Sequence, residues 1–330
     1  MPAPTIGLKY PTVSFEDEIF MNVYFTIDST ENVVELGMIT YSSNVTDYGV
    51  DTAEQVIPGY TYNASNGYLS VRTKGIPAKS LGDVIYFSVY AQLTDGSYVY
   101  TPLVGYNPKT YAYSQLSSGS AEMKALVVAM LNYGAAAQTY FGYRTDAPVN
   151  ADLTAEQKAL ISGYDAAMMD AVVQADSAKL GEFVSDKQYT KRYPTISFEG
   201  AFSINYYFQP SLTPVGDVTM YLWSLSDFNA ATTLTRQNAT KAIPMELTET
   251  GEYLAAVEGI AAKDLDKAVY VSFVYSDGTT EHAAGVIGYS IGTYCNTQAT
   301  KTGTFADLAA ATAVYGYYAK QAFYQLTIDN

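Results

Sequence analysis

The chain has 330 residues, of which 48% are hydrophobic and 15% charged, a composition typical of a globular protein long enough for two domains. Its net charge is −15, with 18 Lys and Arg against 33 Asp and Glu, and this balance would repel a phosphate backbone, so we expect no nucleic-acid partner. No apolar run approaches the roughly 18 residues that a membrane span requires. Cys295 is the only cysteine, which excludes an intrachain disulfide and a thiolate metal cage within one chain.

One stretch near the N-terminus occurs twice. Residues 10–25 return as residues 193–208, with nine of the sixteen positions identical at a constant offset of 183. A second stretch, residues 75–88, returns as residues 259–272 with seven of fourteen identical. Repetition of this length indicates an internal duplication. Residues kept in both copies are therefore expected to hold the scaffold, and residues that differ are the candidates for specificity.

Short segments rich in Val, Ile, Tyr and Thr follow the first stretch. They recur about every 8–12 residues and are separated by turn signals such as Asn66-Gly67 and Asp95-Gly96. The segments cover residues 33–42, 52–58, 68–72, 84–93 and 98–104. This spacing predicts a sandwich of about seven strands, of the immunoglobulin-like kind, and the second copy repeats the plan.

Each copy then ends in a helical pattern. From Ser120 to about Tyr143, apolar residues recur at intervals of three and four, with Ser120 placed as an N-cap. The second copy has a matching pattern over residues 304–325, and Tyr315-Gly316 repeats Tyr133-Gly134. Small residues in the first helix would allow close packing on a sheet. We expect each helix to cover one face of its sandwich.

An Ala-rich segment separates the copies. Residues 152–180 predict one or two further helices, with Thr154 and Gln157 at the spacing of a capping box. The predicted organisation is a mainly β protein with helices (α+β). It comprises a first sandwich with its closing helix over residues 1–149, a helical linker over 150–191, and a second sandwich with its closing helix over 192–330.

Groups that catalyse reactions are scarce in this sequence. His282 is the only histidine, and no Gly-x-Ser-x-Gly nucleophile motif accompanies it, so we expect an ordinary strand residue. Cys295 is expected to be a buried, inert thiol in a β context. The clustered carboxylates of residues 16–18 fit a turn or a solvated surface better than a glycosidase pair. The sequence therefore predicts no enzyme, no catalytic residue, no metal site and no cofactor.

Tyrosine is unusually frequent, at 32 of 330 residues. Tyrosine is favoured both at recognition surfaces and in strands, so the two explanations need separating. Alignment of the copies pairs Tyr41 with Trp223, which indicates that both are scaffold. Four tyrosines specific to the first copy flank hairpin signals and are the candidate ligand-binding residues, although strand packing remains an open alternative for all of them: Tyr60, Tyr62, Tyr98 and Tyr100.

The string at residues 130–143, Met-Leu-Asn-Tyr-Gly-Ala-Ala-Ala-Gln-Thr-Tyr-Phe-Gly-Tyr, resembles the helix that closes β-rich repeat modules in large surface proteins of gut clostridia-type bacteria. The resemblance extends more weakly to residues 315–323. It implies a bacterial surface protein. Proteins of this kind include B-cell superantigens that bind immunoglobulins through variable-domain framework surfaces. The resemblance supplies no residue-level binding motif to match, so it assigns no binding residue to this chain.

These observations favour a non-enzymatic, monomeric binding module, either attached to the cell wall or secreted, that forms part of a larger extracellular protein. The expected partner is a host protein, namely immunoglobulin Fab. Two alternatives stay open: a carbohydrate-binding module of a polysaccharide-degrading surface protein, and a structural stalk repeat. A hydrolase ranks below all three.

Overall fold

The computed structural model describes residues 2–16, 18–169, 179–183, 187–198 and 201–325. The chain divides into two compact units, Met1–Ile161 (unit 1) and Ser162–Asn330 (unit 2). The described residues form four antiparallel sheets together with α-helices and short 3-10 turns. The protein is therefore mainly β with helices, an α+β architecture, as the sequence predicted.

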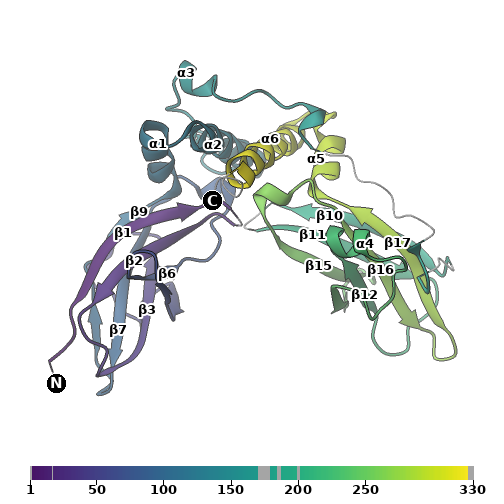
Figure 1. The fold of residues 1–330 in the computed structure, drawn as a ribbon, viewed down its shortest axis with the longest axis horizontal. Helices are drawn as coiled ribbons and strands as arrows, with labels where there is room; N and C mark the ends of the chain where they lie inside the picture. The colour runs from purple at the N-terminus through teal and green to yellow at the C-terminus, as the bar shows by residue number, and fades with distance from the viewer. Residues whose placement is uncertain (1, 17, 170–178, 184–186, 199–200, 326–330) are drawn as a thin grey trace. The chain divides into compact units, whose positions relative to one another are not determined.

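Unit 1 contains two sheets (Figure 1). The first has the order β1-β2-β6-β5, with bounds β1 Ile6–Ser14, β2 Phe20–Ile27, β5 Thr61–Asn63 and β6 Tyr68–Arg72. The second has the order β4-β3-β7-β8, with β9 also pairing with β7; its bounds are β3 Val33–Tyr41, β4 Gln55–Pro58, β7 Ile85–Leu93, β8 Tyr98–Tyr100 and β9 Val104–Tyr106. Burial alternates along β2, where Met21, Val23 and Phe25 are buried and the residues between them are partly exposed. This period of two directs one face of the strand into the core.

Unit 2 repeats this order strand for strand. Its first sheet is β10-β11-β15-β14, with bounds β10 Tyr189–Ser197, β11 Phe202–Pro210, β14 Glu246–Leu247 and β15 Tyr253–Ile260. Its second sheet is β13-β12-β16-β17, with bounds β12 Thr219–Trp223, β13 Lys241–Pro244, β16 Val269–Ser276 and β17 Glu281–Tyr289. The ring of Phe208 on β11 stacks on that of Phe273 on β16 with centroids 5.0 Å apart. The two sheets therefore face each other across a shared core.

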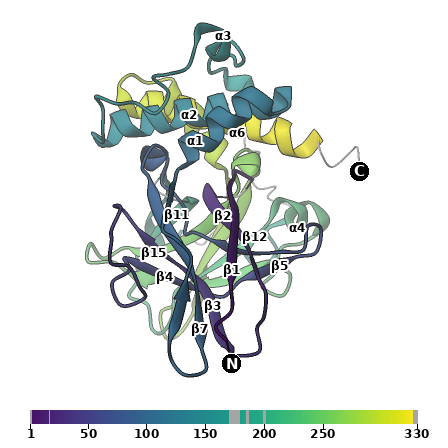
Figure 2. The ribbon, with the colours of Figure 1, turned by 90° about the vertical axis from the view of Figure 1, so that its left-hand side faces the viewer.

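Helices close each unit. Their bounds are α1 Pro108–Ser118 and α2 Ala121–Phe141 in unit 1, and α5 Ile291–Ala299 and α6 Thr304–Gln325 in unit 2. Ser120 caps α2 as predicted, because its side chain accepts a hydrogen bond from Met123 N at 3.2 Å. The helices of unit 1 lie across one end of its sheets (Figure 2). The expectation that the helix covers a sheet face is therefore wrong.

Two glycines explain where the closing helices pack. A Cβ on Gly134 of α2 would lie 2.8 Å from Leu81 Cδ1 and 3.1 Å from the carbonyl oxygen of Ala78, in the 3-10 turn η1 (Ala78–Ser80). Gly316 of α6 meets the turn η4 (Ala262–Asp264) with nearly the same distances. The Tyr-Gly pair kept in both copies thus allows the helix to approach a 3-10 turn, and the small residues serve this contact.

Two helices, α1 and α5, were not predicted from the sequence. Asn107 caps α1 by accepting from Thr110 N at 2.7 Å, and Pro108 occupies the first helical turn, a combination typical of a helix start. Ser290 caps α5 in the same way. Cys295 lies in α5, so its predicted β context is wrong, whereas its predicted burial is confirmed.

In the described part of the segment between the copies there are a short helix, α3 (Ala155–Lys158), and a 3-10 turn, η2 (Ala166–Met168). The predicted capping box of Thr154 and Gln157 is present. Residues 170–178 of the predicted linker lie outside the described residues. Of the described helices, none is both long enough and apolar enough to span a membrane.

Val149, just before this segment, and Met169, within it, make equivalent contacts in their own units. A Cβ on Gly134 would lie 2.9 Å from Val149 Cγ1, and one on Gly316 would lie 2.7 Å from Met169 Cε. Each unit thus uses one apolar side chain to cover the contact between its closing helix and its 3-10 turn.

Candidate functional site

The four candidate tyrosines fall on two different sheets of unit 1. Tyr60 and Tyr62 lie at β5, the last strand of the first sheet, and their side chains are 52% and 61% exposed. Tyr98 and Tyr100 lie on β8, the last strand of the second sheet. The structure therefore presents two separate pairs.

Tyr98 and Tyr100 are partly buried and held by their neighbours. Their rings stack on each other with centroids 5.9 Å apart, and Tyr98 also meets the edge of Tyr90. The hydroxyl of Tyr100 accepts a hydrogen bond from Val50 N at 3.1 Å, and burial raises the pKa of Tyr100. These contacts favour the alternative interpretation for this pair, a structural role beneath the connection from β3 to β4.

Tyr60 and Tyr62 lie on what we call the β4/β5 edge, made of strands β4 and β5 with the residues between them; two exposed valines lie on β3 (Val34) and β4 (Val56). The two valines are 65% and 42% exposed. Tyr60 and Val34 also line one hollow of about 280 Å³. Among the described strands, β4 and β5 each stand at the end of their sheet and pair on one side only. The β4/β5 edge therefore combines apolar side chains with backbone groups able to pair with another strand.

Unit 1 also contains a groove of about 600 Å³. It lies where the ends of β3 and β4 meet the segment from β6 to β7 and the residues that follow α2. Its lining residues are Thr40, Tyr41, Ser42, Ser43, Asn44, Glu54, Gln55, Thr73, Lys74, Gly75, Ile76, Pro77, Ser80, Gly82, Asp83, Val84, Ile85, Tyr86, Tyr143 and Arg144. This volume is in the range of small-molecule sites in proteins.

Hydrogen bonds organise the groove's polar wall. The carboxylate of Asp83 accepts from Tyr143 OH at 2.7 Å and pairs with the Arg144 guanidinium at 3.1 Å. Arg144 has a positive φ of 48°, just after Gly142 turns the chain at the end of α2. Across the groove, Glu54 accepts from both the backbone N and the hydroxyl of Ser42. The lining of the groove thus holds acceptors and donors beside one another.

In unit 2 a longer connection covers the ring that corresponds to Tyr86. The connection from β12 to β13 spans 17 residues (224–240), against 13 residues (42–54) between β3 and β4, and it forms helix α4 (Leu225–Ala230). Phe228 of α4 stacks on Tyr270, with ring centroids 3.6 Å apart. Tyr270 is the counterpart of Tyr86, which lines the groove in unit 1. The difference in connection length was the signal in the sequence that could have revealed the groove.

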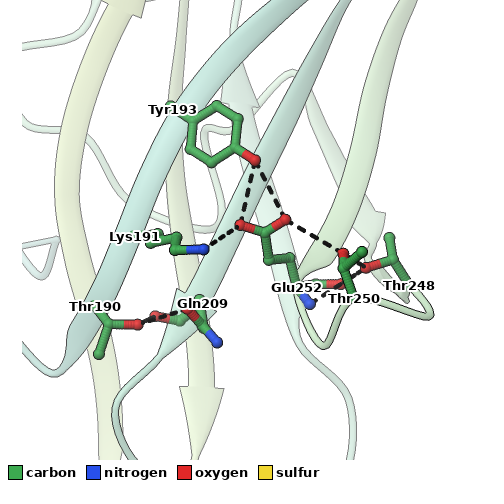
Figure 3. Close-up of polar contacts among 7 residues, drawn as sticks. All are labelled: Thr190, Lys191, Tyr193, Gln209, Thr248, Thr250 and Glu252. Carbon is green, nitrogen blue, oxygen red and sulfur yellow. Dashed lines mark hydrogen bonds and ion pairs between the residues drawn. The ribbon is translucent and has the colours of Figure 1, made fainter.

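A polar cluster distinguishes the first sheet of unit 2 (Figure 3). The buried carboxylate of Glu252 accepts one bifurcated hydrogen bond from Tyr193 OH, which lies 3.2 Å from each carboxylate oxygen, and pairs with Lys191 Nζ at 3.3 Å. Thr250 Oγ1 donates to the same carboxylate at 3.4 Å. Beside it, Thr190 Oγ1 bonds the side chain of Gln209. Because its partners satisfy the carboxylate, the cluster ties the turn between β14 and β15 to β10.

The two side chains best suited to covalent chemistry, His282 and Cys295, are both buried. His282 lies in β17 as predicted, is buried, and its Nε2 lies 3.0 Å from Asp277 Oδ2. Burial raises the pKa of the Cys295 thiol to about 12. Trp223 is buried and donates from Nε1 to Asn238, which confirms it as scaffold. Within the described ranges, no group of three or more His, Cys, Asp or Glu is arranged to hold a metal ion.

No protein-family model matches the chain, and no curated protein is significantly similar to it. The two copies within the chain therefore supply the comparison from which functional positions are inferred.

Proposed function

We propose that the chain is a non-enzymatic binding module of an extracellular bacterial surface protein, and that it binds the variable domains of host immunoglobulins. The proposal includes the finer fold, two tandem immunoglobulin-like sandwiches each closed by helices. The strand orders support it: lettered A to G in chain order, with β4 as C′, the first sheet reads A-B-E-D and the second C′-C-F-G. The immunoglobulin partner is supported by the resemblance of the helix at residues 130–143.

The observation that carries the proposal is the β4/β5 edge. Tyr60 and Tyr62 offer large contact areas with few rotatable bonds, which is why tyrosine is frequent at recognition surfaces. Exposed Val34 and Val56 extend this surface with apolar area. The neighbouring strand edges provide unpaired backbone groups for a β-rich partner. An immunoglobulin variable domain is such a partner.

Two observations support the non-enzymatic part of the proposal. His282, the one histidine, is buried against Asp277 in a strand, and its ring lies beside Tyr275. The thiol of Cys295 is buried in α5 with a raised pKa, which keeps the nucleophilic thiolate form scarce at neutral pH.

Biolayer interferometry of the chain against polyclonal IgA and IgM Fab tests the proposal, with Fc as a control. Replacing both Tyr60→Ala and Tyr62→Ala should weaken Fab binding by at least about tenfold, a loss typical of interface hot spots. The melting temperature should stay nearly unchanged, because both side chains are exposed. The matched control is Leu247→Ala on β14, which occupies the register position of Tyr62 in unit 2 and is 63% exposed, and it should leave Fab binding intact.

The outcomes separate the alternatives. Unchanged binding of the double tyrosine variant would contradict the β4/β5 edge as the contact surface. Absence of binding to any Fab would contradict the immunoglobulin partner and would favour the stalk or carbohydrate hypothesis.

A further inference from the structure

We infer that the groove of unit 1 is a binding site for a neutral carbohydrate, separate from the β4/β5 edge and independent of the immunoglobulin proposal. The groove's lining residues come from four places in the sequence, and its volume of about 600 Å³ would hold one or a few sugar rings.

The chemistry of the lining matches that of a sugar. Each hydroxyl of a sugar both donates and accepts hydrogen bonds, so its site needs both kinds of partner. In the groove, Glu54 and Asp83 provide acceptors, whereas Lys74 and Arg144 provide donors. Gln55 adds an amide that can do both.

Tyrosine rings complete this match. Tyr86 and Tyr143 both line the groove, and their rings offer apolar surface to the C–H groups of a pyranose. Tyr143 is held in place by its hydrogen bond to Asp83 at 2.7 Å. Tyr143 lies in the turn that ends α2. Gly142 and Arg144, on either side of it, both have positive φ values, which turn the chain at this point.

The charges argue against an ionic ligand. Two carboxylates, Glu54 and Asp83, balance the two cations Lys74 and Arg144, so the groove has no net formal charge. Arg144 is already paired with Asp83 at 3.1 Å. An anion would have to compete with that pairing, and a wholly apolar ligand would strip water from polar groups without replacing their hydrogen bonds.

The duplication provides an internal control for the inference. In unit 2 the aromatic ring equivalent to Tyr86 is covered by Phe228, and Lys267 stands at the position of Asp83. Lys267 pairs with Asp264 at 2.7 Å. These two features of the groove, an open Tyr86 ring and the Asp83 carboxylate, are therefore specific to the first copy, as expected of residues that provide specificity and not scaffold.

A printed array of neutral and acidic glycans, probed with the labelled intact chain, tests this inference, followed by titration calorimetry with the neutral oligosaccharides that bind. Asn44→Trp places a large ring in the groove at an exposed position, and should abolish binding. Arg144→Gly should weaken binding at least tenfold, and glycine suits the positive φ at this position, so the fold should be kept. Asn229→Trp is the matched control, because Asn229 is exposed on α4 of unit 2.

The expected result is binding to neutral glycans that both groove variants reduce and the control retains, at unchanged melting temperature. A silent array, binding to acidic glycans alone, or full binding by Asn44→Trp would each overturn the inference. The Tyr60→Ala, Tyr62→Ala variant should still bind glycan, and Asn44→Trp should still bind Fab, so failure of one proposal is distinguishable from failure of the other.

Discussion

The two units share a strand order but differ in what covers the outer face of their second sheet. In unit 1 the connection from β3 to β4 packs Tyr48 and Val50 against Tyr41 and Tyr100. In unit 2 the longer connection forms α4 and packs Phe228 against Tyr270. A duplicated β scaffold thus keeps its core and strand pairing while a connection of different length decides whether a region is open or filled.

The end of the closing helix shows the same divergence. In unit 1 the residues after α2 supply Tyr143 and Arg144 to Asp83. In unit 2 the charge at the position of Asp83 is reversed, and Lys267 bonds the hydroxyl of Tyr324 on α6. In unit 2, Lys267 therefore bonds residues of its own unit at the position where Asp83 of unit 1 lines the groove.

The largest expected effect comes from removing the ring that fills unit 2. Phe228→Ala should destabilise unit 2 by about 3–5 kcal/mol, because it deletes a buried, stacked aromatic side chain. Denaturant unfolding followed by Trp223 fluorescence measures this, since Trp223 is the only tryptophan and packs in the same cluster. Tyr48→Ala in unit 1 should leave the Trp223 transition in place. An equal shift in both variants would contradict independent covers for the two units.

The closing helices offer a second test. An added Cβ at either glycine would lie 2.8 Å from a leucine methyl and 3.1 or 3.2 Å from a backbone carbonyl oxygen, but its third neighbour differs: branched Val149 at 2.9 Å for Gly134 and the flexible end of Met169 at 2.7 Å for Gly316. Overpacking costs about 1–3 kcal/mol, partly offset by about 1 kcal/mol of helix propensity. Gly134→Ala should therefore lower the free energy of unfolding more than Gly316→Ala does.

Circular dichroism at increasing denaturant concentration measures both helix variants. Gly163→Ala is the control, because a Cβ at Gly163 would meet no heavy atom within 4 Å outside its own residue and its two chain neighbours. Equal losses for Gly134→Ala and Gly316→Ala would show that the flexible methionine gives no relief.

Two aspartates in equivalent turns differ by two partners. Asp277 has a lowered pKa, first because of its hydrogen bond to His282 and then because of bonds from Thr279 and Thr280. Asp95, its counterpart in unit 1, has a lowered pKa from its bonds to Ser97. Asp277→Asn should destabilise the protein more than Asp95→Asn at pH 7.

The sign of the pH dependence follows from the lowered pKa of the folded state. Stabilisation by each carboxylate is present above the unfolded pKa of about 3.9 and is lost as pH falls through the folded pKa. Thermal melts between pH 7 and pH 2 should show the gap between wild type and Asp277→Asn closing below about pH 4. A gap that stays constant to pH 2 would contradict the role of the charged form.

The smallest effect is expected at the single thiol. Cys295 should react with Ellman's reagent at pH 8 only after unfolding, because burial raises its pKa to about 12. Its counterpart in unit 1 is Ala112, also buried. Cys295→Ala should therefore cost about 1 kcal/mol or less, as expected for a small loss of buried volume. Rapid reaction in the native state would show that α5 opens.

The sequence by itself predicted what depends on local pattern and on the repeat. The repeated stretch beginning at Tyr10 indicated two copies, and the Ser120 cap with its apolar stripe predicted α2 to within two residues. Alignment of the copies predicted Trp223 to be a scaffold residue, and the structure shows its side chain buried. These features follow from hydrogen bonds and side-chain periodicity between residues close in sequence, or from comparison of aligned positions.

Only the tertiary structure decided which surfaces are open. It separated exposed Tyr60 and Tyr62 from Tyr98 and Tyr100, which have the same alternating spacing but lie under a loop. It placed the closing helices at the end of the sheets, and it brought Glu54 and Asp83 to one groove. Side chains distant in sequence meet there because strand pairing and helix packing bring them together, and no local pattern encodes such a meeting.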